Sequence, residues 1–541
     1  MFPKARPKTA SCLATTRPSP LGSGRSCVHF STFDGETLRM SQRSVLRVPV
    51  SLRTLLPAAS FVGCADIRVT DAVECSQKCT PQTLFAAIPG THVDGAAFVD
   101  DAIQHGANSL LVQRPLPKAP VPQCVVPNVR RAYAELCSAL AGHPSRHLNL
   151  IGVTGTNGKT TVTWLIRSIF ETSGRRAGLL GTIEYHNGVD SAPSEMTTPD
   201  SKVLTNWLTA MVANGTTHAA LEVSSHALDQ ERIAGTQFDA AIVTNITQDH
   251  FDYHHDANHY RESKAKLLEH LKPHGLVVLN ADDPESAALA ERLGPDARWV
   301  TFGLERAAHI WATVLEESLH GTRFRLHRGA ESMEITTSLV GRHNVSNCLA
   351  AAAAMERFDI SLEEVKAGIE ALRFVPGRLE RVECGQPFDV FIDYAHTEDA
   401  LRRCVRSLKR LGRGRVICTV GAGGDRDRSK RPLIGRAASD ADVTIITSDN
   451  PRSEDPEQII REIVSGCGPM EHPPVIEPDR GEAIRRAIES AEAGDCVLVA
   501  GKGHEREQII GSKRIPFVDR DVVRAILNRR RQIAEAAHCG A

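Results

Sequence analysis

A mostly apolar segment that runs into a glycine-broken turn and then into a helix is the feature that most constrains how this chain folds. Residues 148–153 are typical of a buried strand, and from residue 162 apolar side chains recur at helical spacing until Gly174 can close the helix. In such a turn backbone N–H groups converge on an anion, and the helix N-terminus adds positive potential. The segment predicts a phosphate-binding loop in which Lys159 reaches the β- and γ-phosphates of a nucleotide and Thr160 ligates Mg²⁺.

The spacing of this loop differs from the common form. A G-x-x-x-x-G-K-[ST] loop needs a glycine where this chain has Val153, and Gly155 comes later. The alternative is a chance turn rich in glycine and threonine. We disfavour it because the strand, the loop, the lysine and the helix are all in register.

The bulk properties predict a multidomain enzyme with small substrates. A chain of 541 residues fits several domains. Its 64 Lys and Arg residues balance 65 Asp and Glu, so the charge favours neither nucleic acid nor a membrane surface. The 14 cysteines are scattered, and Cys418 and Cys496 lie in apolar runs, which favours reduced thiols and a cytoplasmic protein. We expect a monomer.

The chain divides into four segments by composition and pattern. Residues 1–60 are rich in Arg, Ser and Pro and predict a disordered extension, at least to about residue 40. An organelle transit peptide and a start placed before Met40 are the alternatives. Residues 61–147, 148–374 and 375–541 each alternate apolar strands with helices, which predicts three α/β domains with mainly parallel sheets.

Polar clusters follow several predicted strands of the central segment. Glu222 ends the strand at 218–223, and His250 follows the strand at 240–246. Ligands in parallel sheets bind at the carboxyl ends of strands, although a lone polar residue there is more often a helix cap. Because several clusters share a sheet with the phosphate loop, we expect Glu222 and His250 to be metal ligands.

The loop T-G-T-N-G-K-T-T at 154–161 resembles that of the Mur ligase and folylpolyglutamate synthetase superfamily. Four further motifs match it: D-H-F-D-Y-H at 249–254 with Tyr260 and Lys264, G-R-H-N-V-S-N at 341–347, P-G-R-L-E at 376–380, and D-Y-A-H at 393–396. The resemblance implies a three-domain ligase that uses ATP and Mg²⁺. It implies an ATP site made of Gly155, Thr156, Asn157, Gly158, Lys159, Thr160, Thr161, Asn344, Arg378 and Asp393.

The family carbamylates the lysine that corresponds to Lys264. An ammonium cannot ligate Mg²⁺, whereas a carbamate derived from CO₂ can. The resemblance therefore implies a metal site made of Thr160, Glu222, His250 and Lys264 as N6-carboxylysine. It also implies that Lys159, Glu222, His250 and Lys264 carry the catalysis. The alternative to a metal-binding role is that Lys264 belongs to the solvated basic face of a helix.

The segment F-A-A-I-P-G-T-H-V-D-G at 85–95 resembles the uridine-nucleotide domain of the muramyl ligases. Members usually have D-S-R after the first strand, and the corresponding positions here are taken as Asp71-Ala72-Val73. The resemblance implies that the UDP-muramoyl-dipeptide contacts Asp71, Thr91, His92, Val93, Thr197, Thr198, Ser224, Gln230 and Arg232.

Two motifs of the last segment indicate the amino-acid substrate. Asp449-Asn450-Pro451-Arg452 matches the D-N-P-R of family members that add meso-diaminopimelate, and Gly501-Lys502-Gly503-His504-Glu505 matches G-K-G-H-E. Arg452 offers a planar fork for the extra carboxylate of diaminopimelate and would repel the ammonium of lysine. The expected contacts are Arg426, Asp449, Asn450, Pro451, Arg452, Gly501 and Glu505.

The resemblance implies a ligase that activates the D-glutamate carboxylate as an acyl phosphate and joins it to meso-diaminopimelate in peptidoglycan precursor synthesis. Three alternatives remain open: a lysine-adding relative, a folylpolyglutamate synthetase, and a nucleotide-binding partner without catalysis. The uridine-type domain and Arg452 argue against the second, and the intact Lys159 and Lys264 argue against the third.

Overall fold

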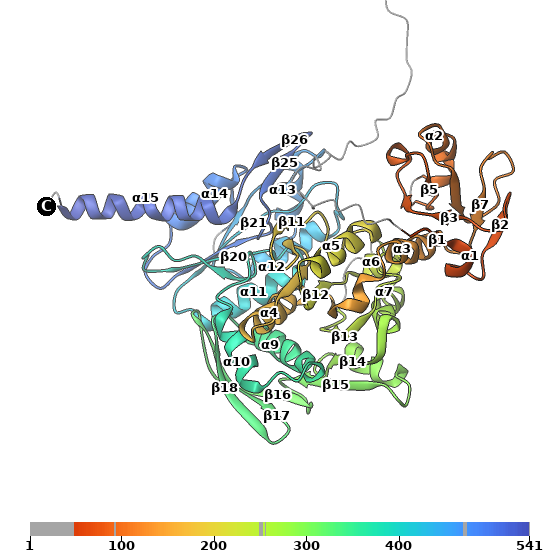
Figure 1. The fold of residues 1–541 in the computed structure, drawn as a ribbon. Coiled ribbons are helices and arrows are strands. Elements are labelled where there is room, and N and C mark those ends of the chain that lie inside the picture. Colours follow the sequence, from red (N-terminus) through yellow and green to blue (C-terminus); the bar gives the residue numbers. More distant parts are fainter. Residues whose placement is uncertain (1–47, 91–92, 248–252, 255, 469–472, 540–541) are drawn as a thin grey trace, which may run out of the picture. The chain divides into compact units, whose positions relative to one another are not determined.

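The structure is a computed structural model that describes residues 48–90, 93–247, 253–254, 256–468 and 473–539. Three large sheets, of five, eleven and six strands, follow one another along the chain, each packed with helices (Figure 1). The α/β class predicted from alternating strand and helix patterns is confirmed.

The first sheet has the order β2-β7-β6-β5-β4, and its inner neighbours are parallel. The unit around it consists of β1 (Val50–Ser51), α1 (Leu52–Leu55), β2 (Ser60–Val62), β3 (Arg68–Val69), β4 (Asp71–Val73), β5 (Thr83–Ala86), α2 (Val99–Gln104), β6 (Ser109–Val112), β7 (Gln123–Val125) and α3 (Val129–Leu140), and β1 and β3 pair as a separate two-stranded sheet.

This unit begins earlier than the sequence predicts. Residues 48–60 were assigned to a disordered extension, yet they hold β1, α1 and the start of β2. Leu52 is fully buried in the same apolar cluster as Leu84 and Leu111. The boundary at residue 61 is therefore too late, because a short apolar helix after an Arg-rich segment gives little periodicity to detect.

The central sheet has the order β11-β10-β9-β12-β8-β13-β14-β15-β16-β17-β18. Its strands are β8 (Asn149–Thr154), β9 (Ala177–Leu180), β10 (Glu184–His186), β11 (Ser191–Pro193), β12 (His218–Glu222), β13 (Phe238–Val243), β14 (Leu271–Asn280), β15 (Arg298–Gly303), β16 (Ile310–Ser318), β17 (Gly321–Arg328) and β18 (Glu331–Thr337). Its helices are α4 (Lys159–Thr172), α5 (Ser201–Ala213), α6 (Ser225–Asp229), α7 (Ala257–Ala265), α8 (Pro284–Ala288), α9 (Arg342–Ala354) and α10 (Leu362–Ala371).

Strand β8 lies between two parallel neighbours, β12 and β13. All three are buried along nearly their whole length, as continuous apolar strands covered on both faces should be. Helix α4 packs on the sheet through Val162, Leu165 and Ile169, each fully buried. The carboxyl ends of the three strands therefore meet at one edge, directly before α4.

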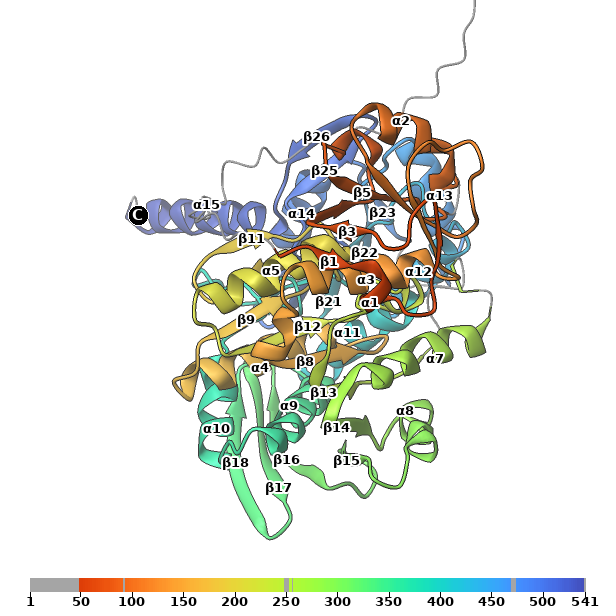
Figure 2. The ribbon, with the colours of Figure 1, turned by 45° about the vertical axis from the view of Figure 1, so that its right-hand side comes forward.

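Beyond β16 the sheet becomes antiparallel. Strands β16, β17 and β18 form a meander that extends the sheet past its parallel part (Figure 2). Its strands alternate buried and exposed residues, so one face of the meander meets water. Glu317 on β16 accepts two hydrogen bonds from Arg410, at 2.6 and 2.8 Å.

The third sheet has the order β19-β20-β24-β21-β22-β23 and is parallel except for β19. Its strands are β19 (Glu380–Arg381), β20 (Asp389–Asp393), β21 (Val416–Val420), β22 (Val443–Ile446), β23 (Val475–Ile476) and β24 (Cys496–Ala500), and the hairpin β25 (Glu507–Ile510) and β26 (Lys513–Pro516) follows it. Its helices are α11 (Glu398–Leu411), α12 (Lys430–Ala438), α13 (Pro456–Val464), α14 (Arg480–Glu489) and α15 (Asp519–Cys539).

The cysteines and the lengths of the helices add two further observations. Cys418 on β21 and Cys496 on β24 are buried free thiols, as predicted. Among the residues the structure describes, every helix is too short or too polar to cross a bilayer.

Candidate active site

The predicted phosphate loop joins β8 to α4. Gly155 has φ +145° and Gly158 has φ +89°, values in the left-handed region that glycine tolerates best. A Cβ at Gly158 would lie 2.5 Å from Asn347 Oδ1. The Lys159 ammonium folds back and donates to the carbonyl oxygens of Gly155 at 2.8 Å and Thr156 at 3.0 Å. The loop thus has the tight turn that anion binding by backbone N–H groups requires.

The segment after β13 holds this loop in place. Thr156 N donates to Asn245 O at 2.8 Å, and Asn157 N donates to Asn245 Oδ1 at 2.9 Å. Thr244 Oγ1 donates to Asn157 O at 2.6 Å. Because these bonds use the backbone and side chains of residues at the carboxyl end of the neighbouring strand, the two polar stretches form one rigid unit.

Thr160, the first threonine after the lysine, contacts the buried carboxylate of Glu222. Thr160 Oγ1 donates to Glu222 Oε2 at 3.0 Å, and Glu222 is fully buried. Thr182, after β9, donates to Glu222 through its amide and its hydroxyl, both at 2.8 Å. A buried carboxylate beside a hydroxyl is a suitable oxygen site for a divalent cation. Thr182 was not predicted, although it follows an apolar strand as the other polar clusters do.

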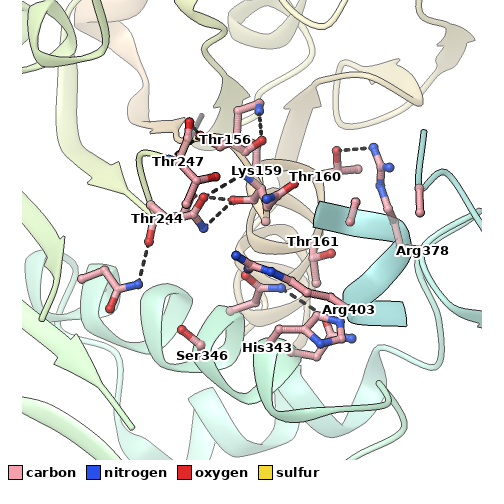
Figure 3. Close-up of a pocket in the computed structure, with 18 of the residues that line it drawn as sticks. Thr156, Lys159, Thr160, Thr161, Thr244, Thr247, His343, Ser346, Arg378 and Arg403 are labelled. Atoms are coloured by element: carbon pink, nitrogen blue, oxygen red, sulfur yellow. Dashed lines mark hydrogen bonds between the residues drawn. The ribbon is translucent and has the colours of Figure 1, made fainter. Parts of the chain in front are cut away.

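Arg378 and Tyr394 face the loop across a cavity of about 550 Å³. Arg378 donates to Thr160 Oγ1 at 3.1 Å (Figure 3), and its guanidinium lies 4.7 Å from the centre of the Tyr394 ring. All the ATP-site residues predicted from sequence line this cavity except Gly155, whose carbonyl is bound by Lys159: Thr156, Asn157, Gly158, Lys159, Thr160, Thr161, Asn344, Arg378 and Asp393.

Asp393 and Asn344 line the cavity, but their side chains are engaged with the protein. Asp393 accepts from the amides of Leu379 at 2.6 Å and Ala395 at 2.7 Å, and burial raises its pKa. Asn344 Nδ2 donates to Val340 O at 2.9 Å. Both therefore shape the cavity wall in this conformation.

His343 and Arg403 line the same cavity and lie close together in Figure 3. Burial, followed by the charge of Arg403, lowers the pKa of His343 to about 4, so the imidazole is neutral at pH 7. Neither residue was predicted as a nucleotide contact. Arg403 lies on the strongly basic helix α11, where one arginine cannot be distinguished from its neighbours by pattern.

Lys264 lies on α7 and is almost completely buried. Its Nζ is 4.4 Å from the centre of the Tyr260 ring, and the Tyr260 hydroxyl is 3.1 Å from Thr156 Oγ1. Burial and nearby charges, including Lys264, lower the pKa of His254 to about 4. The predicted ligand His250 lies outside the described residues, so its place in the site stays a prediction.

A second cavity, of about 160 Å³, is lined by residues of both the first unit and the central one. Gln230 and Arg232, two of the predicted dipeptide contacts, line it with Glu74, Arg130 and Tyr133. Arg232 donates to Gln230 Oε1 at 2.7 Å. Burial raises the pKa of Glu74 to about 6. Glu74, Arg130 and Tyr133 were missed because no quoted motif includes them.

The other predicted dipeptide contacts divide into two groups. Thr197 accepts a hydrogen bond from Thr182 Oγ1 at 3.1 Å, and Thr198 Oγ1 accepts one from the Ser224 amide at 3.0 Å. Thr197, Thr198 and Ser224 therefore lie around the end of β12. Val93 is exposed, and Thr91 and His92 lie outside the described residues.

Asp71 does not lie where the sequence placed it. Asp71-Ala72-Val73 forms β4 itself, so the residues after the strand are Glu74, Cys75 and Ser76. Asp71 pairs with Lys202 at 2.9 Å and does not line the second cavity. These three residues therefore form a strand and do not follow one, because the strand starts later than the apolar pattern indicated, and the contact of Asp71 with the dipeptide stays a prediction.

The predicted amino-acid contacts meet at the carboxyl ends of β21, β22 and β24. Arg452 has φ +50°, and its NH1 donates to Gly424 O at 2.7 Å. A Cβ at Gly423 would lie 2.7 Å from Arg452 NH1 and 3.6 Å from Arg426 Cγ, so both arginines flank this glycine. A Cβ at Gly501 would lie 2.8 Å from Asp449 Oδ2. Asn450 donates to Glu505 Oε2 at 2.7 Å, and Pro451 is buried beside it.

This geometry defines a multidomain nucleotide-binding enzyme with a phosphate loop, an opposing arginine and a separate polar site on the last sheet. Three family models match successive parts of the chain: "Mur ligase family, catalytic domain" at 74–141, "Mur ligase middle domain" at 153–355, and "Mur ligase, glutamate ligase domain" at 377–503. The chain belongs to the Mur ligase family, whose members are ATP-dependent, ADP-forming ligases.

Several similar proteins, which share the name of one ligase, support this assignment to the Mur ligase family. The UDP-N-acetylmuramoyl-L-alanyl-D-glutamate–2,6-diaminopimelate ligase of Geobacillus thermodenitrificans is 43% identical over 84% of this chain and 94% of its own. That of Gloeobacter violaceus is 42% identical over 86% and 95%. A solved structure of a ligase of this name has a TM-score of 0.64 at 32% identity, covering 89% of this chain and 99% of that one. A Mycobacterium tuberculosis folylpolyglutamate synthase shares the fold, with a TM-score of 0.57 at 19% identity.

Proposed function

We propose that the chain joins meso-2,6-diaminopimelate to the D-glutamate of UDP-N-acetylmuramoyl-L-alanyl-D-glutamate, with hydrolysis of ATP to ADP and phosphate. The observation that carries the proposal is the pair Arg452 and Arg426 beside Asp449 and Glu505. Diaminopimelate carries two carboxylates and two ammonium groups, so a site with paired arginines and carboxylates complements it. Relatives at 43% and 42% identity carry the name of this activity.

The reaction proceeds in two steps under this proposal. The γ-phosphoryl group of ATP is transferred to the D-glutamate γ-carboxylate, which gives an acyl phosphate and ADP. The unprotonated amine of diaminopimelate then attacks the acyl carbon, so that an N–C bond forms, the C–O bond to phosphate breaks, and phosphate leaves with the proton that the amine gives up. Lys159, bound to Gly155 O, and Arg378, bound to Thr160 Oγ1, line the same cavity and would neutralise negative charge on the transferred group.

Thr160 and Glu222 fit the Mg²⁺ that the family uses. Their oxygens lie 3.0 Å apart, and the carboxylate is fully buried, so both ligand atoms are fixed and shielded from water. Oxygen ligands of this type suit Mg²⁺. When bound, the ion supplies charge neutralisation to the phosphoryl group.

We further propose that Lys264 is carboxylated by CO₂, with loss of a proton from the amine, and that it completes the metal site with His250. Lys264 is almost fully buried, where an ammonium is costly. Among the described residues, both ring nitrogens of the neighbouring His254 lack a hydrogen-bond partner, so an acceptor oxygen would suit this region. The proposal does not depend on the choice of amino-acid substrate.

The carbamate has its own experiment. Activity should fall when CO₂ and bicarbonate are removed, and Lys264→Ala should lose nearly all turnover and regain part with added short carboxylates. Lys266→Ala, two residues away and half-exposed, is the matched control. An unmodified amine in a high-resolution map of active enzyme would refute the carbamate.

The main experiment is ADP release by the purified chain with UDP-muramoyl-dipeptide and a panel of amino acids. We expect turnover with meso-diaminopimelate and little with L-lysine. Preference for lysine would favour the lysine-adding relative. Turnover with a folate and glutamate would favour the synthetase.

A further inference from the structure

Lys502 is a buried lysine that the reaction as described above does not use. It lies between Gly501 and Gly503 in the loop after β24, and its side chain is fully buried. Lysine is rarely buried completely unless its charge is paired. The loop also holds Glu505, one of the expected amino-acid contacts.

Three acceptors surround the Lys502 ammonium. Nζ donates to Asn450 Oδ1 at 3.1 Å, to Glu505 Oε2 at 2.9 Å and to Glu507 O at 2.6 Å. An ammonium has three hydrogens, so its donor capacity is used completely. The acceptors come from three different segments: the D-N-P-R loop, the G-K-G-H-E loop and β25.

These bonds fix which oxygen of Glu505 can meet a substrate. Lys502 Nζ and Asn450 Nδ2 both donate to Oε2, at 2.9 and 2.7 Å. Within the described ranges, Glu505 Oε1 has no hydrogen-bond donor from the protein. The carboxylate therefore presents one oxygen to the site, and the Lys502 charge offsets part of its negative charge.

Asn450 is fixed in the same way. Its Oδ1 accepts from Lys502 Nζ and from the Ile509 amide at 2.9 Å. The following arginine is bound to the same hairpin: the Arg452 amide donates to Ile509 O at 3.0 Å, and Gly511 N donates to Arg452 O at 2.7 Å. The hairpin β25–β26 and Lys502 together hold the D-N-P-R loop against Glu505.

The backbone of the loop has a separate anchor. Arg480 donates to both oxygens of Asp519 at 2.7 Å and to Ala500 O at 3.0 Å, and both side chains of this pair are buried. The end of β24 is thus fixed without Lys502. Removal of the ammonium should release the side chains of Asn450 and Glu505 more than the strand.

We propose that Lys502 is a positioning residue of the amino-acid site, which orients Glu505 and Asn450 for the ammonium and carboxylate at the far end of the incoming amino acid. The inference rests on the proposed function, because it assumes that Glu505 meets the amino-acid substrate.

The experiment is a double-mutant cycle with Lys502→Met, Glu505→Gln and the double variant, assayed by steady-state kinetics with the amino acid that the wild type uses. We expect Lys502→Met to raise the KM for the amino acid about 10- to 100-fold, as loss of a charged hydrogen bond should. The KM for ATP and for the dipeptide should stay unchanged. In the Glu505→Gln background the further rise should be less than about threefold.

Lys118→Met, on an exposed turn of the first unit, is the control and should leave every constant unchanged. Lys502→Gln keeps a polar head and replaces the methionine variant if that one does not fold, with thermal melting as the check. An unchanged amino-acid KM, or full additivity with Glu505→Gln, would overturn the inference while leaving the proposed function intact. A wild type that ligates no amino acid would overturn both.

Discussion

Thr160 receives a hydrogen bond from Arg378 and donates one to Glu222, so one hydroxyl links two sides of the cavity. The role of a single side chain in the cavity therefore depends on the partners that it contacts. Arg452 is another example, because burial and the nearby Arg426 lower its pKa, while Asp449 and Glu505 raise it. The guanidinium stays charged at pH 7, held among carboxylates and ready to pair with an anion.

Arg452→Ala should raise the KM for meso-diaminopimelate by the equivalent of about 2–5 kcal/mol, because a desolvated arginine–carboxylate pair loses one partner. Steady-state kinetics against diaminopimelate and lysine measures this. Lysine activity need not appear, since Asp449 and Glu505 still shape the pocket for a longer substrate.

Arg461→Ala, on the exposed face of α13, is the matched control for this variant. The KM for ATP should be the same in both variants. If Arg452→Ala keeps the wild-type KM for diaminopimelate, the assignment of the far carboxylate to Arg452 fails.

At the scale of elements, the sequence predicted the parallel strands well and the antiparallel additions poorly. Strands β8, β12 and β13 are continuous apolar runs, which pattern detects directly. Strand β18 alternates polar and buried residues over a short length, and the hairpin β25–β26 is mostly exposed, so neither has a strong apolar signal. Tertiary pairing determines such strands.

In the candidate site, too, the sequence placed the residues that lie in local motifs but did not reveal every contact that those residues make. Family motifs placed Lys159, Arg378 and Asn344 around one cavity, because each lies in a local pattern. Lys502 lies inside the G-K-G-H-E motif, yet the motif alone does not indicate that the acceptors of its ammonium come from residues 450, 505 and 507. A lysine between glycines is typical of a solvated turn, and only the packed structure reveals the burial.

The turn before α4 gives a prediction about an element. Gly158→Ala should weaken ATP binding by about 5- to 150-fold, because φ +89° is strained for alanine and the new Cβ would meet Asn347 Oδ1 at 2.5 Å. Strain and displacement of this size cost about 1–3 kcal/mol. Calorimetric titration with ATP measures the change.

Gly294→Ala is the control, because a Cβ there meets no atom within 4 Å and the φ is not positive. It should bind ATP like the wild type. Equal affinity in Gly158→Ala would show that the loop tolerates a side chain and that its turn is not required for the nucleotide.

At the scale of the whole molecule, the contribution of the N-terminal residues can be tested by truncation. Deletion of residues 1–47 should leave activity unchanged, because their Arg-, Ser- and Pro-rich composition offers little to bury. Deletion of residues 1–60 should lower stability by about 2–5 kcal/mol, because it removes Leu52 and its packing in the first unit.

Thermal melting and specific activity of the two truncated proteins compare these outcomes directly. The shorter deletion serves as the control for the longer one. Equal stability would mean that β1 and α1 contribute nothing to the first unit, and a loss of activity in the shorter deletion would assign a role to residues 1–47.

Acid should destabilise the whole chain through its buried histidines. Burial lowers the pKa of His218 and His270 to about 4 and that of His504 to about 3. As the pH falls below about 6.5, the unfolded chain binds protons that the folded chain refuses until about pH 4, so the free energy of unfolding decreases across that window.

Urea unfolding at pH 7 and pH 5 measures this decrease. His218→Gln should remove part of it, on the order of 1–2 kcal/mol, because His218 is buried on β12. His320→Gln, on an exposed turn, is the control. An identical pH dependence in His218→Gln and wild type would contradict this explanation.

The backbone around Arg378 belongs to the third sheet. Tyr394 N donates to Gly377 O at 2.8 Å, and Gly377 N donates to Glu380 Oε2 at 2.9 Å. Asp393 binds the Leu379 amide, and β19 begins at Glu380 and pairs with β20. Any pivot between the central and third sheets must therefore lie before Gly377, in residues 372–376. Arg378 is thus fixed to the third sheet, so any shift of that sheet relative to the central one would break its hydrogen bond to Thr160.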